Sequence, residues 1–74
     1  MDIRIDKPGR VKIMVFNMVG EEVKVLLDQD MVMGNSRVYW DGRNRKGEIL
    51  GNAVYLVAIE TPLGQMIRKV IILK

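Results

Sequence analysis

Apolar side chains occupy every second position through much of this sequence. Ile3 and Ile5 alternate with charged residues, and Val11, Ile13 and Val15 form a second series of the same kind. A period of two places such side chains on one face of a β-strand and polar ones on the other. The sequence therefore predicts half-buried strands from its first residues onward.

The last two predicted strands differ from the earlier ones because they are apolar on both faces. They cover 53–60 and 65–73, and the turn residues Thr61-Pro62-Leu63-Gly64 separate them. Strands of this composition are typically covered on both sides, so we expect both to be central in a sheet. Short strands punctuated by Gly, Pro, Asn and Asp about every ten residues indicate one antiparallel sandwich or small barrel, spanning 1–74.

Two segments in the first half of the chain are harder to interpret. A helix competes with a strand for 21–27, and the β-branched content favours a strand with Val23 and Val25 facing inward. Segment 28–35 is predicted to be irregular. It contains Met31, Val32 and Met33, which we expect to fold over the open end of the core as a lid.

The residues from Trp40 to Gly47 predict a corner where the chain leaves one sheet for another. Trp40 ends an apolar run, Asp41 can bond its own backbone, and Gly42 and Gly47 are free to adopt positive φ. Trp40 and Tyr55 are predicted to fill the core with their polar atoms hydrogen-bonded. Tyr39 has the opposite parity to Trp40 and is therefore expected to face solvent.

Composition excludes most kinds of catalytic site. The 74 residues include no cysteine and no histidine, so thiolate and imidazole chemistry are absent. Segment 41–47 superficially resembles a calcium loop, but Arg43 and Arg45 stand where oxygen ligands are needed. Ser36 has no histidine to activate it. We therefore predict a protein that is not an enzyme and uses neither a cofactor nor a metal.

The formal net charge of +3 permits an acidic partner. One candidate surface patch combines cations of the corner with two earlier residues: Arg37, Tyr39, Arg43, Arg45 and Lys46. This patch is the basis of an alternative function, a small basic barrel that binds nucleic acid, although nucleic acid is the less favoured partner. A second alternative is a carbohydrate-binding module that uses the exposed aromatic residues.

Targeting signals are also missing from the sequence. No apolar run approaches the roughly 20 residues that span a bilayer. Residues 1–4 lack the basic and apolar regions of a signal peptide. The chain is thus predicted to be either cytoplasmic or part of a larger exported protein.

The pattern from Arg10 to Lys74 resembles the immunoglobulin-like domain of flagellar hook-capping proteins and the related C-terminal sorting domains of type IX secretion. The resemblance is carried by Val-Lys-Ile-Met-Val-Phe-Asn at 11–17, Val-Tyr-Trp-Asp-Gly-Arg at 38–43 and Arg-Lys-Val-Ile-Ile-Leu-Lys at 68–74. The family usually has glycine where this chain has Ala53, and its opening Pro-Asn-Pro segment is absent here.

The resemblance implies an immunoglobulin- or fibronectin-III-like sandwich of six to seven strands, and leaves open whether the first strand is missing. It implies the C-terminal module of an exported or cell-surface bacterial protein, acting in sorting, attachment or assembly. The partners would be secretion or assembly proteins or the preceding domains, with homo-oligomers forming through exposed sheet edges. The residues we expect to be recognised lie in the last strand: Arg68, Lys69, Val70, Ile71 and Lys74.

Overall fold

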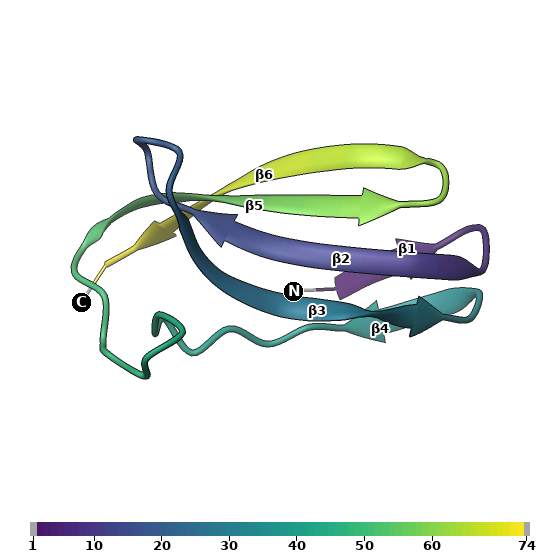
Figure 1. Cartoon of the computed structure of the whole chain (residues 1–74), viewed down its shortest axis with the longest axis horizontal. Coiled ribbons are helices and arrows are strands. Elements are labelled where there is room, and N and C mark those ends of the chain that lie inside the picture. Colours follow the sequence, from purple (N-terminus) through teal and green to yellow (C-terminus); the bar gives the residue numbers. More distant parts are fainter. Residues whose placement is uncertain (1, 74) are drawn as a thin grey trace.

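The computed structural model describes residues 2–73 and contains two antiparallel β-sheets (Figure 1). The strands are β1 (Asp2–Ile5), β2 (Gly9–Phe16), β3 (Glu22–Met31), β4 (Gly34–Arg37), β5 (Ala53–Thr61) and β6 (Gly64–Ile72). One sheet contains β1 and β4, and the other has the order β3-β2-β5-β6. The predicted all-β antiparallel sandwich is confirmed, with six strands in the described part of the chain.

The core lies between the two sheets, and the alternation in the sequence builds it. Its buried members come from β1, β2, β5 and the segment after β4: Ile3, Ile5, Val11, Ile13, Val15, Val38, Tyr55, Val57 and Ile59. The side chains of Val11, Ile13 and Val15 are completely buried, as their period of two predicts. Burial of this apolar area is the main stabilising contribution to the fold.

The prediction that the last two strands are both central is wrong for β6. β5 lies between β2 and β6, whereas β6 is the edge strand of the four-stranded sheet. Ile67 and Ile71 in β6 are 63% and 59% exposed. The apolar composition of β6 reflects Val70 and Ile72, which pack against the core, and a second apolar row on the uncovered outer face.

Segment 21–27 is extended, as predicted, but the inward orientation of Val25 is wrong. Val25 pairs with Met14 of β2 and is 39% exposed. The pairing of β2 with β3 shifts register between Ile13 and Met14 and again between Val15 and Phe16. A bulge inserts one residue and moves the following side chains to the other face. Val25 therefore faces outward, while Leu26 and Leu27 pack against the core.

The prediction of an irregular lid over 28–35 is also wrong. β3 continues to Met31, which pairs with Gly9, and β4 already begins at Gly34. Met31 packs against the core, but Val32 and Met33 are 80% and 63% exposed in the short turn between the strands. Pairing with the full length of β2 extends the strand, because ladder hydrogen bonds satisfy backbone groups that a loop would leave to water.

Candidate functional site

The corner after β4 carries the chain from the two-stranded sheet to the four-stranded sheet, as predicted. Val38 is buried, Tyr39 is 83% exposed and Trp40 packs against the core. The Trp40 ring meets the Tyr55 ring edge to face, with centroids 5.6 Å apart and planes at 76°. Trp40 Nε1 donates a hydrogen bond to the Arg43 carbonyl (3.0 Å), and Tyr55 Oη donates to the Gly51 carbonyl (3.4 Å).

The polar residues of the corner fix its backbone. Asp41 Oδ1 accepts a hydrogen bond from the N–H of Arg43 (3.1 Å), so the predicted side-chain turn is present. Gly42 and Gly47 have φ of 76° and 82°, the left-handed conformation that glycine adopts without a steric cost. The N–H of Leu50 donates to the Gly42 carbonyl at 3.0 Å and closes the loop on itself.

Two loops of this protein share one design that sequence reasoning overlooked. Asn17 and Asn44 each begin a stretch Asn-x-x-Gly-Glu, at 17–21 and 44–48. In each loop the asparagine Oδ1 accepts two backbone N–H groups, at 3.1 and 2.9 Å for Asn17 and at 3.0 Å twice for Asn44. Its Nδ2 donates to the glutamate carboxylate, Glu21 or Glu48, at 3.2 and 3.0 Å. The repeated five-residue pattern is the feature of the sequence from which this shared loop structure could be predicted.

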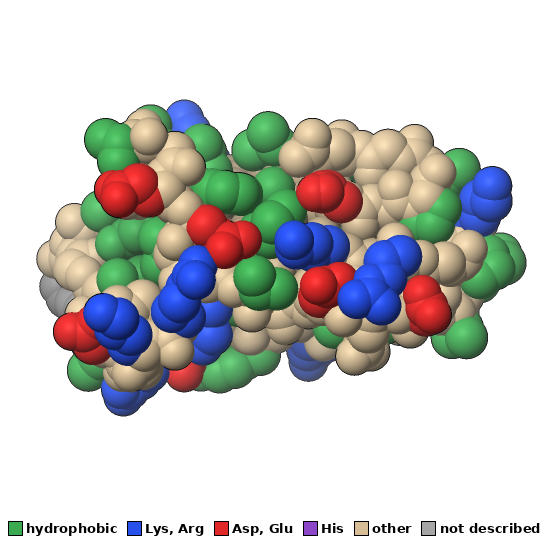
Figure 2. Space-filling model, viewed as in Figure 1, with side chains coloured by type: hydrophobic (Ala, Val, Ile, Leu, Met, Phe, Trp, Pro, Cys, Tyr) green, Lys and Arg blue, Asp and Glu red, His purple; other side chains and the backbone are tan. Residues whose placement is uncertain are grey.

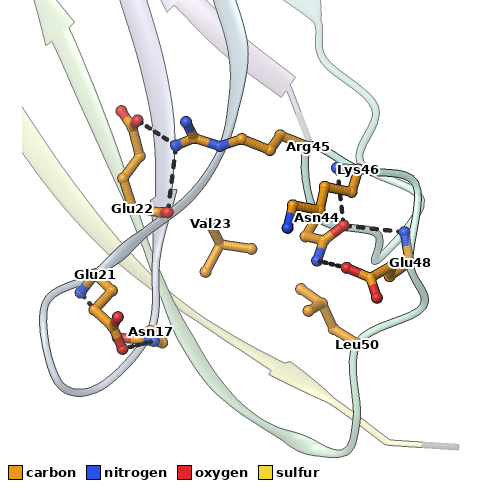
Figure 3. A pocket seen from close by; sticks show the side chains of 9 residues that line it. All are labelled: Asn17, Glu21, Glu22, Val23, Asn44, Arg45, Lys46, Glu48 and Leu50. Carbon is orange, nitrogen blue, oxygen red and sulfur yellow. Dashed lines mark hydrogen bonds and ion pairs between the residues drawn. The ribbon is translucent and has the colours of Figure 1, made fainter.

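A shallow hollow of about 270 Å³ separates these two loops (Figure 3). Val23 and Leu50 form its apolar part, and the other lining residues are polar or charged. Carboxylates and cations both border it, namely Glu21, Glu22, Glu48, Arg45 and Lys46. Within residues 2–73 no three carboxylate, histidine or cysteine side chains are grouped to hold a metal ion. The hollow presents no nucleophile and base pair, so we assign it no chemistry.

Arg45 joins the corner to the start of β3. Its backbone N–H donates to the Val23 carbonyl (3.2 Å), and its guanidinium contacts the Glu22 carboxylate at 2.7 Å (Figure 3). These contacts occupy backbone and side-chain groups on the free edge of β3. The edge of the four-stranded sheet at β3 is therefore partly closed by the chain itself.

The predicted basic surface patch is largely neutralised by neighbouring carboxylates. Arg37 contacts Asp2 at 3.0 Å, Arg43 lies 3.8 Å from Asp41, and Arg45 pairs with Glu22. All five members of the patch are exposed, but among its cations only Lys46 has no carboxylate of the described residues within 4.0 Å. Trp40 is engaged by Tyr55. Nucleic-acid binding depends on unpaired cations that can replace the counterions of phosphates, so this arrangement offers little support for that alternative.

β6 presents the open edge of the four-stranded sheet. All nine of its residues pair with β5 without a register shift. No backbone hydrogen bond joins its other edge to any of the described residues. Among the residues predicted to be recognised, Arg68, Lys69 and Ile71 are exposed and Val70 packs against the core, whereas Lys74 lies outside the described residues.

Asp41 is the titratable group of the corner with a perturbed pKa. Desolvation raises the pKa of this carboxyl, but the hydrogen bond from the Arg43 N–H and the nearby charges of Lys24 and Arg43 outweigh it. The net result is a pKa below the ordinary value of 3.8. Lys24 Nζ lies 3.5 Å from Asp41 Oδ1 and links the corner to β3.

This lowered pKa predicts an acid-dependent loss of stability. A carboxyl whose pKa is lower in the folded state stabilises the fold above its unfolded pKa, and the contribution disappears as pH falls through the folded pKa. Asp41→Asn should therefore be less stable than the natural protein at neutral pH, and the two should converge below about pH 4. Urea unfolding at several pH values measures this. Asp30→Asn is the control, and an Asp41→Asn difference that is constant with pH would contradict the prediction.

Comparison with known proteins gave no match at the level of protein families, of curated proteins or of solved structures. In the part of the chain that the structure describes, no helix is long and apolar enough to cross a membrane. The outer edge of β6 has backbone donors and acceptors that form no hydrogen bond with another described strand, and such an edge can pair with a further strand.

Proposed function

We propose that this chain is a non-catalytic β-sandwich module that binds another protein by accepting a strand along β6. The observation that carries the proposal is the unbroken, unpaired outer edge of β6, all nine residues of which pair with β5 on the other side. In strand addition, backbone hydrogen bonds provide much of the affinity and alternating side chains provide specificity. Arg68 and Lys69 are successive residues, so they present a positive charge on each face of the edge.

The resemblance of the sequence pattern to hook-capping and sorting domains supports a setting for this binding. A C-terminal module of an exported or cell-surface bacterial protein would use the edge in sorting, attachment or assembly. The partner is a protein of the secretion or assembly machinery, or a preceding domain of the same polypeptide. The apolar residues and the two cations of β6 favour a partner strand that combines apolar and acidic side chains.

Proline scanning tests whether the β6 edge is the binding element. Successive residues of an antiparallel strand direct their N–H groups to opposite edges, so one of Arg68→Pro and Lys69→Pro disrupts pairing with β5. The other removes a donor only from the open edge. Urea unfolding identifies the variant that keeps its fold. That variant is expected to lose export or surface attachment when introduced into the natural protein in its own cells.

The two proline variants act as matched controls for each other. Normal export of the variant that keeps its fold would exclude the β6 edge as the recognised element. Replacing both Lys69 and Lys74 with alanine tests the contribution of side-chain charge alone, because it leaves every backbone donor of β6 in place. We expect this variant to fold normally and to be exported less efficiently than the natural protein.

A further inference from the structure

The outer face of the four-stranded sheet carries an apolar row that no other described element covers. The row crosses all four strands in register, with Val25 of β3, Met14 of β2, Ala58 of β5 and Ile67 of β6. Met14 and Ala58 are 7% and 3% exposed, because their neighbours crowd them, whereas Val25 and Ile67 are 39% and 63% exposed. Figure 2 shows hydrophobic side chains here with charged ones around them.

Two further rows flank this middle row, one toward each end of the strands. One row is polar and reads, from β3 to β6, Asp28, Lys12, Glu60 and Gln65. The other reads Glu22, Phe16, Leu56 and Lys69. Lys12 and Glu60 form no ion pair of 4.0 Å or less within the described part of the chain. The outer face therefore has an apolar centre and charges of both signs in fixed places.

The geometry points to a second copy of this chain as the partner of the outer face, in a face-to-face dimer with its twofold axis parallel to the strands. Such an axis places β3 opposite β6 of the other copy and β2 opposite β5. Each row then meets the same row of the partner copy. The facing pairs are Val25 with Ile67, Met14 with Ala58, Phe16 with Leu56, Lys12 with Glu60, Glu22 with Lys69, and Asp28 with Gln65.

This pairing is complementary in every row. Apolar residues meet apolar residues, and the two charged pairs have opposite signs, which favours both affinity and correct register. Lys12 and Glu60 carry most of this preference, because Glu22 is already paired with Arg45 of its own copy. A twofold axis perpendicular to the strands would instead place each strand opposite its own copy with the rows reversed. Lys12 would then face Phe16, so an unpaired charge would cover an apolar residue. Asp28 would face Glu22, although each of these carboxylates is already paired with an arginine of its own copy. The charge pattern thus selects the axis parallel to the strands.

The size of the face indicates a weak dimer. Four strands about 4.8 Å apart and three rows about 6.6 Å apart cover about 400 Å² on each copy. The total of about 800 Å² is below the roughly 1,200 Å² at which stable specific interfaces begin. Association should therefore be seen at high micromolar concentration, where sedimentation equilibrium measures it directly. Edge binding by β6 uses backbone groups on a different side of the strand, so this inference is independent of the proposed function.

A charge-pair experiment tests the dimer without relying on residues of the core. Val25→Glu and Ile67→Lys each place an unpaired charge opposite an apolar side chain, so each variant alone should dimerise about tenfold or more weakly. Val25 and Ile67 lie on opposite edge strands of one copy but face each other across the proposed interface. Mixing the two monomeric variants should therefore produce a heterodimer, with the new glutamate opposite the new lysine.

Met33→Lys is the matched control, because Met33 and Ile67 are both 63% exposed and Met33 lies in the turn between β3 and β4. It should dimerise like the natural chain, and circular dichroism should show that all variants are folded. A natural chain that remains monomeric at about 1 mM would overturn the inference. Single variants that dimerise normally, or a mixture that shows no heterodimer, would overturn it as well.

Discussion

Replacing Ile13 with alanine is expected to remove about 2–5 kcal/mol from the free energy of unfolding. Ile13 is completely buried at the centre of β2, between Leu27 of β3 and Ile59 of β5. The substitution removes three carbon atoms from a site held by strands on both sides, so the cavity can collapse only partly. A domain of 74 residues has a total stability of about 4–11 kcal/mol. The variant should therefore be largely unfolded at moderate urea concentrations.

Ile49→Ala is the control for this substitution, because it deletes the same atoms from a side chain that is 64% exposed in the corner. It should change the free energy of unfolding by less than about 0.5 kcal/mol. Urea unfolding followed by circular dichroism at low protein concentration measures both variants on the monomer. Equal losses for Ile13→Ala and Ile49→Ala would contradict the assignment of the core to the space between the sheets.

The central strands are the part of the fold that the sequence predicts best. Val11, Ile13 and Val15 follow a strict period of two, and their burial follows from that period alone. The sequence does not predict the order of the strands in the sheet, because β5 and β6 have similar apolar composition. Only the pairing partners distinguish them: β5 has β2 and β6 on its two sides, and β6 has β5 alone. A strand can be apolar on a face that nothing covers, so the apolar composition of β6 does not reveal that it has a neighbouring strand on one side only.

The sequence predicts the individual turns of the candidate site but not the contacts that join them to the rest of the fold. The corner glycines and the Asp41 turn follow from residue chemistry, because positive φ and side-chain turns are local properties. Ion pairs such as Arg37 with Asp2 join residues distant in sequence, and they depend on which strands are neighbours. The outward position of Val25 depends on a register shift between β2 and β3 that no local sequence pattern indicates. Long-range pairing is therefore the information that sequence reasoning lacked.

Trp40 connects the corner to the core, and its replacement by alanine should be the second large loss of stability. The ring packs on Tyr55 and on the core, and its Nε1 holds the Arg43 carbonyl at 3.0 Å. We expect Trp40→Ala to lower the free energy of unfolding by about 3 kcal/mol. Arg45 lies in the same loop as Arg43, so the hydrogen bond from the Arg45 N–H to the Val23 carbonyl of β3 should also weaken. Faster hydrogen exchange at the Arg45 amide would report that local opening.

Trp40→Phe separates the two contributions of the indole. It keeps an aromatic ring beside Tyr55 but removes the hydrogen bond to the Arg43 carbonyl. The expected loss is about 1 kcal/mol, the usual net value of one hydrogen bond, plus a smaller loss from the reduced ring area. Tyr55→Phe is the companion variant, and it removes only the longer 3.4 Å bond to Gly51. If Trp40→Phe were as unstable as Trp40→Ala, the hydrogen bond rather than ring packing would hold the corner, because the indole N–H is the main interaction that both variants lose.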